Sequence, residues 1–440
     1  MKKVDMTKGN VMSVIITLAL PIMGSSLLQF TYNLVDMLWV GGLGSNAVAS
    51  IGSASFFIGL GYSINALVVT GTGIKTSHAI GAKNDKEIKE YINSGIFINF
   101  VLAAIYSLSL IFLGKIFIGF LNLNNIKVEG GAYWYLVVSA PMMFFAFFNL
   151  LYTRILNSYG NNKTALKISA IGIAFNIILD PIFIYIFKFG VSGAAMASLL
   201  ANVIMFMIFT FKFRDIFKFR FDIGISKLKM LDIIRLGFPM AFQRILFTLV
   251  NIILARIIAI FGADAIAAQK IGLQIESITF MVVGGLNGAV ASFVGQNYGA
   301  KKYARIIRGY NSSLKIGVLY ALGTALVFTF MPDILVKLFI RDEATILIAS
   351  GYLKIVAFSG MFTAIEMVSN GLFTGVGKPK IPASISIIFT ILRIPMAWVL
   401  IKFMGVNGIW LSIAISSVLK GGVLYLLYII NIKKKYCEIG

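Results

Sequence analysis

"LALPIMGSSLLQFTYNLV", residues 18–35, is a long apolar stretch with a counterpart, "LGFPMAFQRILFTLVNII", at residues 236–253. Three pairs of residues lie 218 positions apart in the two stretches and just after them: Pro21 and Pro239, Asn33 and Asn251, and Gly44 and Gly262. Further matches follow in the same order, "IGAKNDKEI" with "YGAKKYARI", "ILNSYGNNK" with "LFTGVGKPK", and "FGVSGAAMAS" with "MGVNGIWLSI". An ordered series at a nearly constant offset predicts two copies of one structural unit.

The composition indicates where this repeated unit folds. Of the 440 residues, 59% are hydrophobic and only 13% are charged, and apolar runs recur from end to end. One soluble core cannot bury that much apolar surface, so the chain is predicted to be a polytopic membrane protein. The first apolar stretch is also too long for a cleaved signal peptide, and we expect it to remain as the first helix.

Apolar windows of about twenty residues predict membrane-spanning helices. We expect twelve, six in each copy, near residues 11–40, 47–73, 91–114, 132–153, 165–187, 191–211, 233–261, 266–294, 311–331, 350–374, 382–403 and 407–431.

The basic residues predict the orientation of these helices. The two termini and every second connection hold 26 of the 39 Lys and Arg residues. The opposite connections hold only Lys115, Lys127, Lys188, Lys337, Arg341 and Lys402. Because basic loops stay on the cytoplasmic side, both termini are predicted to be cytoplasmic, in a plasma membrane or bacterial inner membrane.

The fold class expected is therefore an all-α integral membrane protein with two pseudo-symmetric six-helix bundles. The expected boundaries are an amino-terminal lobe at 1–211, a basic cytoplasmic linker at 212–232 and a carboxyl-terminal lobe at 233–440. Six helices is an even number, so both copies cross the membrane in the same sense, around an axis along the membrane normal. Two such bundles can rock about a central cavity, which is the geometry of alternating access. Channels more often close symmetry across several subunits, and we expect a monomer here.

Several other functions are disfavoured. The basic excess, 39 Lys and Arg against 17 Asp and Glu, would suit nucleic acid, but its clustering beside apolar spans indicates membrane topology, with anionic lipid as the partner. A single histidine, His78, and a single cysteine, Cys437, argue against a membrane-embedded enzyme with a metal centre, and no cofactor is expected. The chain also lacks a Gly-x-x-x-x-Gly-Lys-Ser/Thr loop, which disfavours transport driven by ATP.

One acid stands in the middle of a strongly apolar stretch, "FNIILDPIFIYIF", residues 175–187. A carboxylate at membrane depth costs roughly 2.5 to 3.5 kcal/mol on insertion scales, so Asp180 should face protein, water or an ion. Asn176 precedes it by four residues and therefore shares its helical face. Pro181 should disturb the helix at this point.

Other polar residues are predicted at a similar depth in the first bundle. Asp36 in "FTYNLVDMLWV", with Asn33 one turn before it, and Ser198 in "GAAMASLLAN" fall in the outer half of their helices. We therefore expect a site for a proton or Na⁺ formed by Asp36, Asn176, Asp180 and Ser198, with any Na⁺ held by the two acids. The alternative is that hydrogen bonds or separate basic residues satisfy the two acids, although no Lys or Arg lies inside helices 1 to 6 away from their ends.

The second copy differs at the matching positions, where Leu254 aligns with Asp36 and Ala397 with Asp180. The cation site is therefore not duplicated. Arg256 and Glu276 both fall in the outer half of their helices, and a structural ion pair is the favoured interpretation. Glu366, in "MFTAIEMVSNGLF", has no partner that the sequence names and is the second candidate for a functional acid.

The chain resembles the multidrug and toxic compound extrusion (MATE) family over essentially its whole length. The similar segments include "LALPIMGSSLLQFTYNLVDMLWVGGLGSNAVASIG", "GAKNDKEIKEY", "GAKKYARIIRGY", "LNSYGNNKT", "NIILDPIFIY", "GVSGAAMAS" and "GLFTGVGKPKIP". The resemblance implies two six-helix lobes and multidrug efflux, in which cationic or amphipathic compounds leave the cell in exchange for Na⁺ or H⁺.

The resemblance is greatest to the DNA-damage-inducible F branch of that family. It implies that Asp36 is the family's first-helix acid and that Asn176 and Asp180 are the helix 5 amide and acid of the branch. Ser198 stands where that branch usually has Thr, and Pro21 matches a proline at which helix 1 has been proposed to bend.

Two departures concern the second copy. The norfloxacin-resistance branch has a helix 7 acid near residues 243–247, where this chain has none, and Glu366 does not align cleanly with that branch's helix 10 acid. The expected function is secondary active efflux, coupled through the first copy. A flippase for lipids or lipid-linked oligosaccharides is the alternative within the transporters, because such exporters share this broad architecture.

Overall fold

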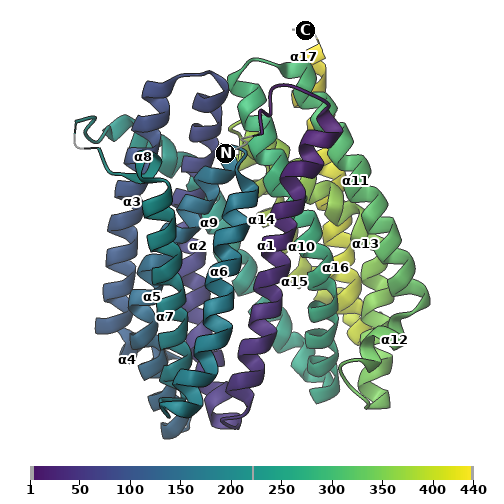
Figure 1. Cartoon of the computed structure of the whole chain (residues 1–440). Coiled ribbons are helices and arrows are strands. Elements are labelled where there is room, and N and C mark those ends of the chain that lie inside the picture. Colours follow the sequence, from purple (N-terminus) through teal and green to yellow (C-terminus); the bar gives the residue numbers. More distant parts are fainter. Residues whose placement is uncertain (1–3, 221, 438–440) are drawn as a thin grey trace. The chain divides into compact units, whose positions relative to one another are not determined.

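The computed structural model describes residues 4–220 and 222–437, and helices dominate these residues (Figure 1). Twelve spans among them are long and apolar enough to cross a membrane. They comprise α1 (Val11–Gly41), α2 (Ser45–Gly81), α3 (Asp85–Phe112), α5 (Ile126–Ser158), α6 (Asn162–Pro181) with the π-helix Ile182–Ile186, α7 (Gly190–Lys212), α9 (Lys227–Ile258) with the 3₁₀ turn Ala259–Phe261, α10 (Ala263–Gly299), α11 (Tyr303–Phe330), α13 (Glu343–Gly375), α14 (Lys380–Ile391) with α15 (Arg393–Met404), and α16 (Val406–Tyr428) with the π-helix Ile429–Lys433.

Short helices complete the described chain: α4 (Gly114–Phe120), α8 (Arg214–Phe217), α12 (Pro332–Lys337) and α17 (Lys434–Cys437). The predicted all-helical class and the twelve spans are confirmed. Several helices are longer than their predicted windows, as in α2, where 47–73 was expected and Ser45–Gly81 is helical. The extra turns are polar, so an apolar window detects only the middle of the helix while its backbone hydrogen bonds continue.

The turns between helices follow the internal repeat. Four pairs of residues with left-handed backbone occupy matching positions in the two copies: Gly44 (φ 95°) and Gly262 (φ 94°), Lys83 (56°) and Lys301 (58°), Gly160 (74°) and Gly377 (80°), and Gly190 (55°) and Gly405 (56°). Residues other than glycine rarely adopt this conformation, so eight such positions in register are strong evidence for a repeated backbone. The two copies therefore share their turns.

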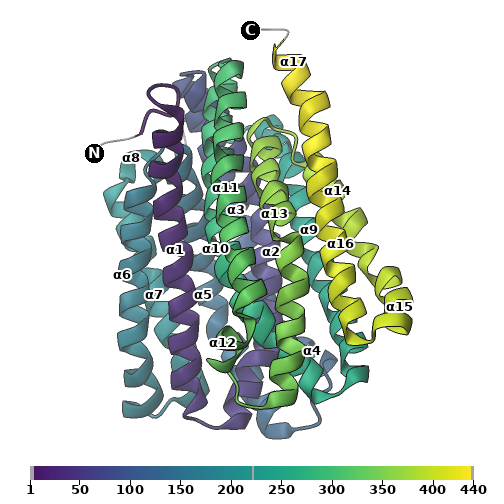
Figure 2. The ribbon, with the colours of Figure 1, turned by 90° about the vertical axis from the view of Figure 1, so that its right-hand side faces the viewer.

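Contacts divide the chain into two compact units, and each is described separately. Unit 1 is built mainly from Gly24–Ala241. Its helix α5 packs against α2, α3 and α7, and the buried side chains of Phe147 and Leu151 lie in this core. Unit 2 comprises Asp5–Met23 and the chain from Phe242 onward. Its helix α13 packs against α10, α11 and α16 (Figure 2). The buried side chains of Tyr352 and Trp410 lie in the core of this unit.

The first turns of α9 belong to unit 1. Lys75 Nζ lies 2.8 Å from Asp232 Oδ2, and Lys229 Nζ lies 3.2 Å from Glu87 Oε1. Gly237 approaches α2 so closely that a Cβ there would lie 1.7 Å from the carbonyl oxygen of Leu67, which no side chain could tolerate. One salt bridge to α2, another to α3 and a close backbone contact with α2 therefore hold this end of α9.

The start of the chain belongs to unit 2. Asn297 Nδ2 and Arg305 Nε each donate to the carbonyl oxygen of Met6 at 3.0 Å. A Cβ at Gly285 would meet the backbone nitrogen of Met23 at 2.9 Å, so the first half of α1 lies tightly against α10. These contact units are thus not identical with the lobes 1–211 and 233–440 that the repeat predicts.

Candidate cation site

Helices α1, α6 and α7 contribute the polar side chains of a site within unit 1. Asn176 and Asp180 lie one turn apart on α6, and their side chains are buried, with 3% and 0% of their surface exposed. Ser198 of α7 is also buried. Asp36 of α1 is partly buried. The spacing that placed an amide and an acid on one helical face therefore directs both into the interior of the unit.

The hydroxyl of Ser198 connects the three helices. Asn176 Nδ2 donates to Ser198 Oγ at 3.2 Å, and the hydroxyl of Tyr32 lies 3.1 Å from the same Oγ. Asn202 Nδ2 donates to the carbonyl oxygen of Ser198 at 2.9 Å. Because Ser198 Oγ contacts side chains from both α1 and α6, it fixes the position of the Asn176 amide.

Several oxygen atoms around this bridge have no donor. Both carboxylate oxygens of Asp180 are buried without a hydrogen bond, and so are Asp36 Oδ1 and Asn176 Oδ1. Buried polar atoms are normally paired, because an unpaired one loses its interaction with water without replacement. These oxygens are hard ligands of the kind that alkali cations prefer, and a carboxylate oxygen also accepts a proton.

The two acids also interact with each other. Asp36 lies close enough to Asp180 for their negative charges to repel when both are ionised. None of the ion pairs between described residues includes either acid. A bound cation or proton would remove this repulsion and satisfy the free oxygens together.

Asp180 lies at the end of α6, just before the chain changes from an α-helix to a π-helix. The α-helix ends at Pro181, and the next five residues form a π-helix in which the N–H of Phe187 donates to the carbonyl oxygen of Ile182 at 2.9 Å. The predicted disturbance at Pro181 is therefore present, because proline has no N–H to continue the α-helical pattern. Such π-helical turns are frequent at functional sites.

Two aromatic residues of the site were missed by the sequence analysis. Tyr32 and the buried Tyr135 of α5 lie within electrostatic range of both Asp36 and Asp180. Tyr32 precedes Asp36 by four residues, so helical spacing would have found it. Tyr135 lies on a distant segment, and only the packing of α5 against α2 and α7 brings it near.

Asn33 does not belong to the site. Its side chain is exposed, and its Oδ1 accepts from Gln29 Nε2 at 3.2 Å. Asn33 was expected one turn before Asp36 at a similar depth, but its side chain is exposed and pairs with Gln29 of the same helix. Pro21 lies inside the continuous helix α1, and its proposed role as a hinge stays a prediction.

A different cluster of charges lies inside unit 2. Lys420 Nζ of α16 forms a salt bridge of 3.0 Å with Glu366 Oε2 of α13. Glu276 Oε2 of α10 accepts a hydrogen bond from the hydroxyl of Tyr352 at 2.6 Å. Arg393 of α15 donates from Nε to Ser416 Oγ at 3.0 Å, and its charge interacts with those of Glu366 and Glu276.

This cluster corrects two expectations. The predicted ion pair between Arg256 and Glu276 is absent from the described residues, because Arg256 is exposed while Glu276 bonds Tyr352. Glu366 has a basic partner after all, Lys420, which the sequence analysis had not singled out.

The repeat relates the two clusters. Three residues of unit 2 lie 217 positions after polar residues of unit 1: Tyr352 after Tyr135, Glu366 after Asn149, and Arg393 after Asn176. The positions that match the two acids, Leu254 and Ala397, are buried in the hydrophobic core of unit 2. A neutral amide in one copy thus corresponds to a charged group in the other, and only the first copy has the pair of acids.

Among the described residues, no group of three His, Cys, Asp or Glu side chains is arranged to hold a metal ion. The unit 1 site instead combines two carboxylates with an amide oxygen and a hydroxyl. That ligand set suits a proton or a monovalent cation better than a transition metal, which prefers imidazole or thiolate ligands.

Comparison with known proteins decides the family. The MatE family model matches the chain twice, at residues 21–182 and at residues 239–399. The chain belongs to the MATE family. The resemblance seen in the sequence and the two-copy organisation are thereby confirmed, since the two matches begin 218 positions apart. The assignment of this MATE protein to the DNA-damage-inducible F branch stays a prediction.

Curated relatives of this MATE protein extend over nearly its whole length. It is 26% identical to the probable multidrug resistance protein NorM of Thermotoga maritima over 435 residues, which cover 95% of this chain and 92% of the relative. It is 25% identical to the multidrug export protein MepA of Staphylococcus aureus over 430 residues, covering 93% and 92%. A relative from Shewanella oneidensis, named FAD transporter, is 24% identical over 433 residues, covering 94% and 93%.

Solved structures share the fold. A transporter of the MOP superfamily from Pyrococcus furiosus superimposes with a TM-score of 0.91 at 22% identity, covering 98% of this chain and 99% of that chain. A mutant of a Vibrio cholerae MATE transporter gives a TM-score of 0.92 at 21% identity, covering 96% and 97%.

Proposed function

We propose that this MATE protein is a secondary active multidrug efflux antiporter of the plasma membrane. It exports cationic or amphipathic compounds and takes up Na⁺ or H⁺ in exchange, by alternating access of two lobes. The names of the curated relatives, which include multidrug resistance and export proteins, support efflux of drugs. The twelve apolar helices support a multi-pass protein, and we propose that it acts as a monomer with both termini in the cytoplasm.

The observation that carries the coupling proposal is the state of Asp180. Its two carboxylate oxygens are fully buried and have no hydrogen-bond donor, and the like charge of Asp36 is nearby. An ionised acid in that setting is costly, so binding of a cation or proton between the two acids is strongly favoured. Asp36 and Asp180 supply the charge, while Asn176 Oδ1 and Ser198 Oγ supply neutral oxygen ligands.

The driving force available from one cation is sufficient for efflux. One charge crossing 100 mV carries about 2.3 kcal/mol, and a tenfold ion gradient adds about 1.4 kcal/mol. Together these sustain a drug gradient of several hundredfold when the exported species crosses without net charge. For a monovalent cationic drug exchanged one for one, the voltage contributions cancel and only the ion gradient drives export.

The experiment that tests this function is dye transport by purified protein in liposomes, with a Na⁺ gradient and a pH gradient imposed in separate runs. We expect at least one gradient to drive accumulation of a fluorescent cation. Asp36→Asn and Asp180→Asn keep side-chain size but remove the charge, so each should abolish gradient-driven transport while equilibrium dye binding persists.

The matched control is Asp264→Asn, because Asp264 lies in the first turn of α10 with an exposed side chain. It should transport at the wild-type rate. Transport at the wild-type rate by folded Asp36→Asn and Asp180→Asn proteins would refute coupling through unit 1, and the acid to test next would be Glu366.

A further inference from the structure

Outside the cation site, a pocket of about 430 Å³ opens in unit 2 between the start of α1 and one face of α11. From α1 it is lined by Val11 and Met12. From α11 it is lined by basic and polar residues at helical spacing, Arg305, Arg308, Ser312 and Lys315. Residues separated by three, four or seven positions share one helical face, so these side chains form a single stripe.

The lining carries three positive charges and no acid. Arg305 is held in place because its Nε donates to the carbonyl oxygen of Met6 at 3.0 Å and its Nη1 to that of Gly9 at 2.7 Å. Arg308 is near enough to Arg305 for their like charges to repel. Lys315 and Arg308 are exposed, and the described residues give neither of them an ion pair.

Asp5, an acid that interacts with Arg305, is already shared. Asp5 accepts from the N–H and the hydroxyl of Thr7 at 2.9 and 2.7 Å, and its Oδ2 lies 3.9 Å from Lys8 Nζ. It also interacts electrostatically with Arg305 and Lys302. Among the described residues, Arg308 and Lys315 are therefore left without a counter-ion.

The start of α1 adds to the positive potential. Asn10 Oδ1 accepts from the N–H of Ser13 at 3.1 Å, which leaves the N–H groups of Val11 and Met12 at the free end of a 31-residue helix. Such N–H groups, with the helix dipole behind them, favour an anion. The pocket thus combines three cationic side chains with a helix amino terminus.

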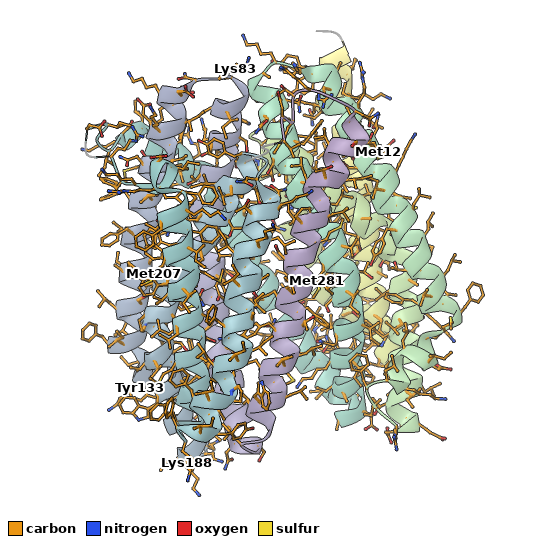
Figure 3. All side chains as sticks on the ribbon, viewed as in Figure 1. Met12, Lys83, Tyr133, Lys188, Met207 and Met281 are labelled. Carbon is orange, nitrogen blue, oxygen red and sulfur yellow. The ribbon has the colours of Figure 1, made fainter. Side chains whose placement is uncertain are left out.

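We propose that this pocket binds the phosphate of an anionic phospholipid from the cytoplasmic leaflet. The apolar side chains of Val11 and Met12 line the pocket together with the cations, which suits a phosphate attached to a glycerol and acyl chains. In Figure 3, Met12 lies near the amino-terminal end of α1, at the top of the view, and Met281 lies near the middle of α10. Lys315 is twelve residues beyond Tyr303, the start of α11, so it lies about 18 Å along that helix.

This depth favours a lipid over a free phosphate ion. A basic stripe that begins at the helix end and continues that far into a membrane span meets both the headgroup layer and the top of the acyl layer. Long basic side chains in that zone extend their charged ends toward lipid phosphates. The cytoplasmic side follows from the proposed orientation of the termini.

The test uses the full-length protein, stripped of lipid in detergent and titrated with phosphatidylglycerol or phosphatidylcholine of the same acyl chains. Bound lipids are counted by native mass spectrometry. We expect phosphatidylglycerol to bind more tightly than phosphatidylcholine. The double substitution Arg308→Gln with Lys315→Gln should weaken phosphatidylglycerol binding by about fivefold per lost charge.

The matched control is Lys433→Gln with Lys434→Gln, which removes two exposed basic residues at the other end of unit 2's sequence. Its phosphatidylglycerol affinity should stay within about twofold of the wild type. An equal loss in the control would show that net charge alone attracts the lipid, and would overturn the proposal. Inorganic phosphate should fail to displace the lipid at millimolar concentration, and displacement would overturn the assignment to a lipid.

Discussion

Lys420 Nζ lies 3.0 Å from Glu366 Oε2, and only 6% and 13% of the two side chains are exposed. Their charges also interact with those of Arg393 and Glu276, so unit 2 contains two acids and two bases in mutual range. A buried ion pair repays the loss of hydration only while both partners are present. Removal of either partner leaves the other buried charge without its direct salt-bridge partner.

We therefore expect Glu366→Gln and Lys420→Met each to destabilise the protein by about 3 to 5 kcal/mol. The double variant should lose clearly less than the sum, because it removes both charges together. Thermal unfolding in detergent, followed by size-exclusion chromatography after heating, measures this. Strict additivity of the two effects would contradict a direct pair.

Arg256→Gln provides the control for that series. Arg256 is exposed and lies on the same unit, so its replacement should change stability by less than about 0.5 kcal/mol. A loss comparable with that of Lys420→Met would show that Arg256 has a structural partner.

Ser198 gives a test of the cation site that preserves both acids. Ser198→Ala removes the hydroxyl that receives the amide of Asn176 and contacts Tyr32. Asn176 Oδ1 would then lose its fixed position, and the ion concentration that gives half-maximal transport should rise by about fivefold. Ser198→Thr retains the hydroxyl and should restore the wild-type value. Equal behaviour of the two variants would exclude Ser198 as an organising group.

Close helix packing predicts that two matching glycines cannot be replaced. A Cβ at Gly193 of α7 would meet the carbonyl oxygen of Phe183 at 2.7 Å, and one at Gly408 of α16 would meet that of Leu400 at 2.5 Å. Since these contacts are with backbone, Gly193→Ala and Gly408→Ala should each destabilise by about 1 to 3 kcal/mol.

Gly59 of α2 is the matched control, because a Cβ there would meet no atom within 4 Å. Gly59→Ala should leave stability unchanged or raise it by up to about 1 kcal/mol, since alanine is the better helix former. Thermal unfolding of the three variants in one detergent gives the comparison. A stable Gly193→Ala protein would show that α7 can move away from the π-helix without loss.

The proposed orientation is tested by labelling single cysteines after Cys437→Ser. In unit 1, Lys83 lies at one end of the helices and Lys188 at the opposite end (Figure 3). We expect Lys218→Cys to react with an impermeant maleimide only from the cytoplasmic side, and Asn46→Cys only from outside. Reaction of both from the same side would overturn the twelve-helix topology.

The fold could be predicted from the sequence because its determinants are local or repeated. Apolar windows of about twenty residues fix the spans, and the matches between Pro21 and Pro239 and between Gly44 and Gly262 reveal the two copies. The pairing of Asn176 with Asp180 is equally local, since both lie on one turn of α6.

The rest of the site depends on packing between distant segments. Lys420 meets Glu366 across α13 and α16, and Tyr352 reaches Glu276 from α13 to α10. Arg256 was predicted to pair with Glu276 because both lie at a similar depth in the membrane. Depth does not determine the direction in which a side chain points. Asn33 was likewise expected at the depth of Asp36, but its side chain is exposed.

The π-helix after Asp180 has a consequence for comparing chains of different length. Gly190 follows Asp180 by ten residues, whereas the matching Gly405 follows Ala397 by eight. A π-helical turn contains about one residue more than an α-helical turn, so Ile182–Ile186 absorbs part of this surplus. An alignment of this chain with shorter relatives should therefore place its gap between Pro181 and Phe189, where a deletion leaves Asp180 in register. A gap placed before Asp180 would rotate the acid by about 100° around α6 and assign it to the wrong face.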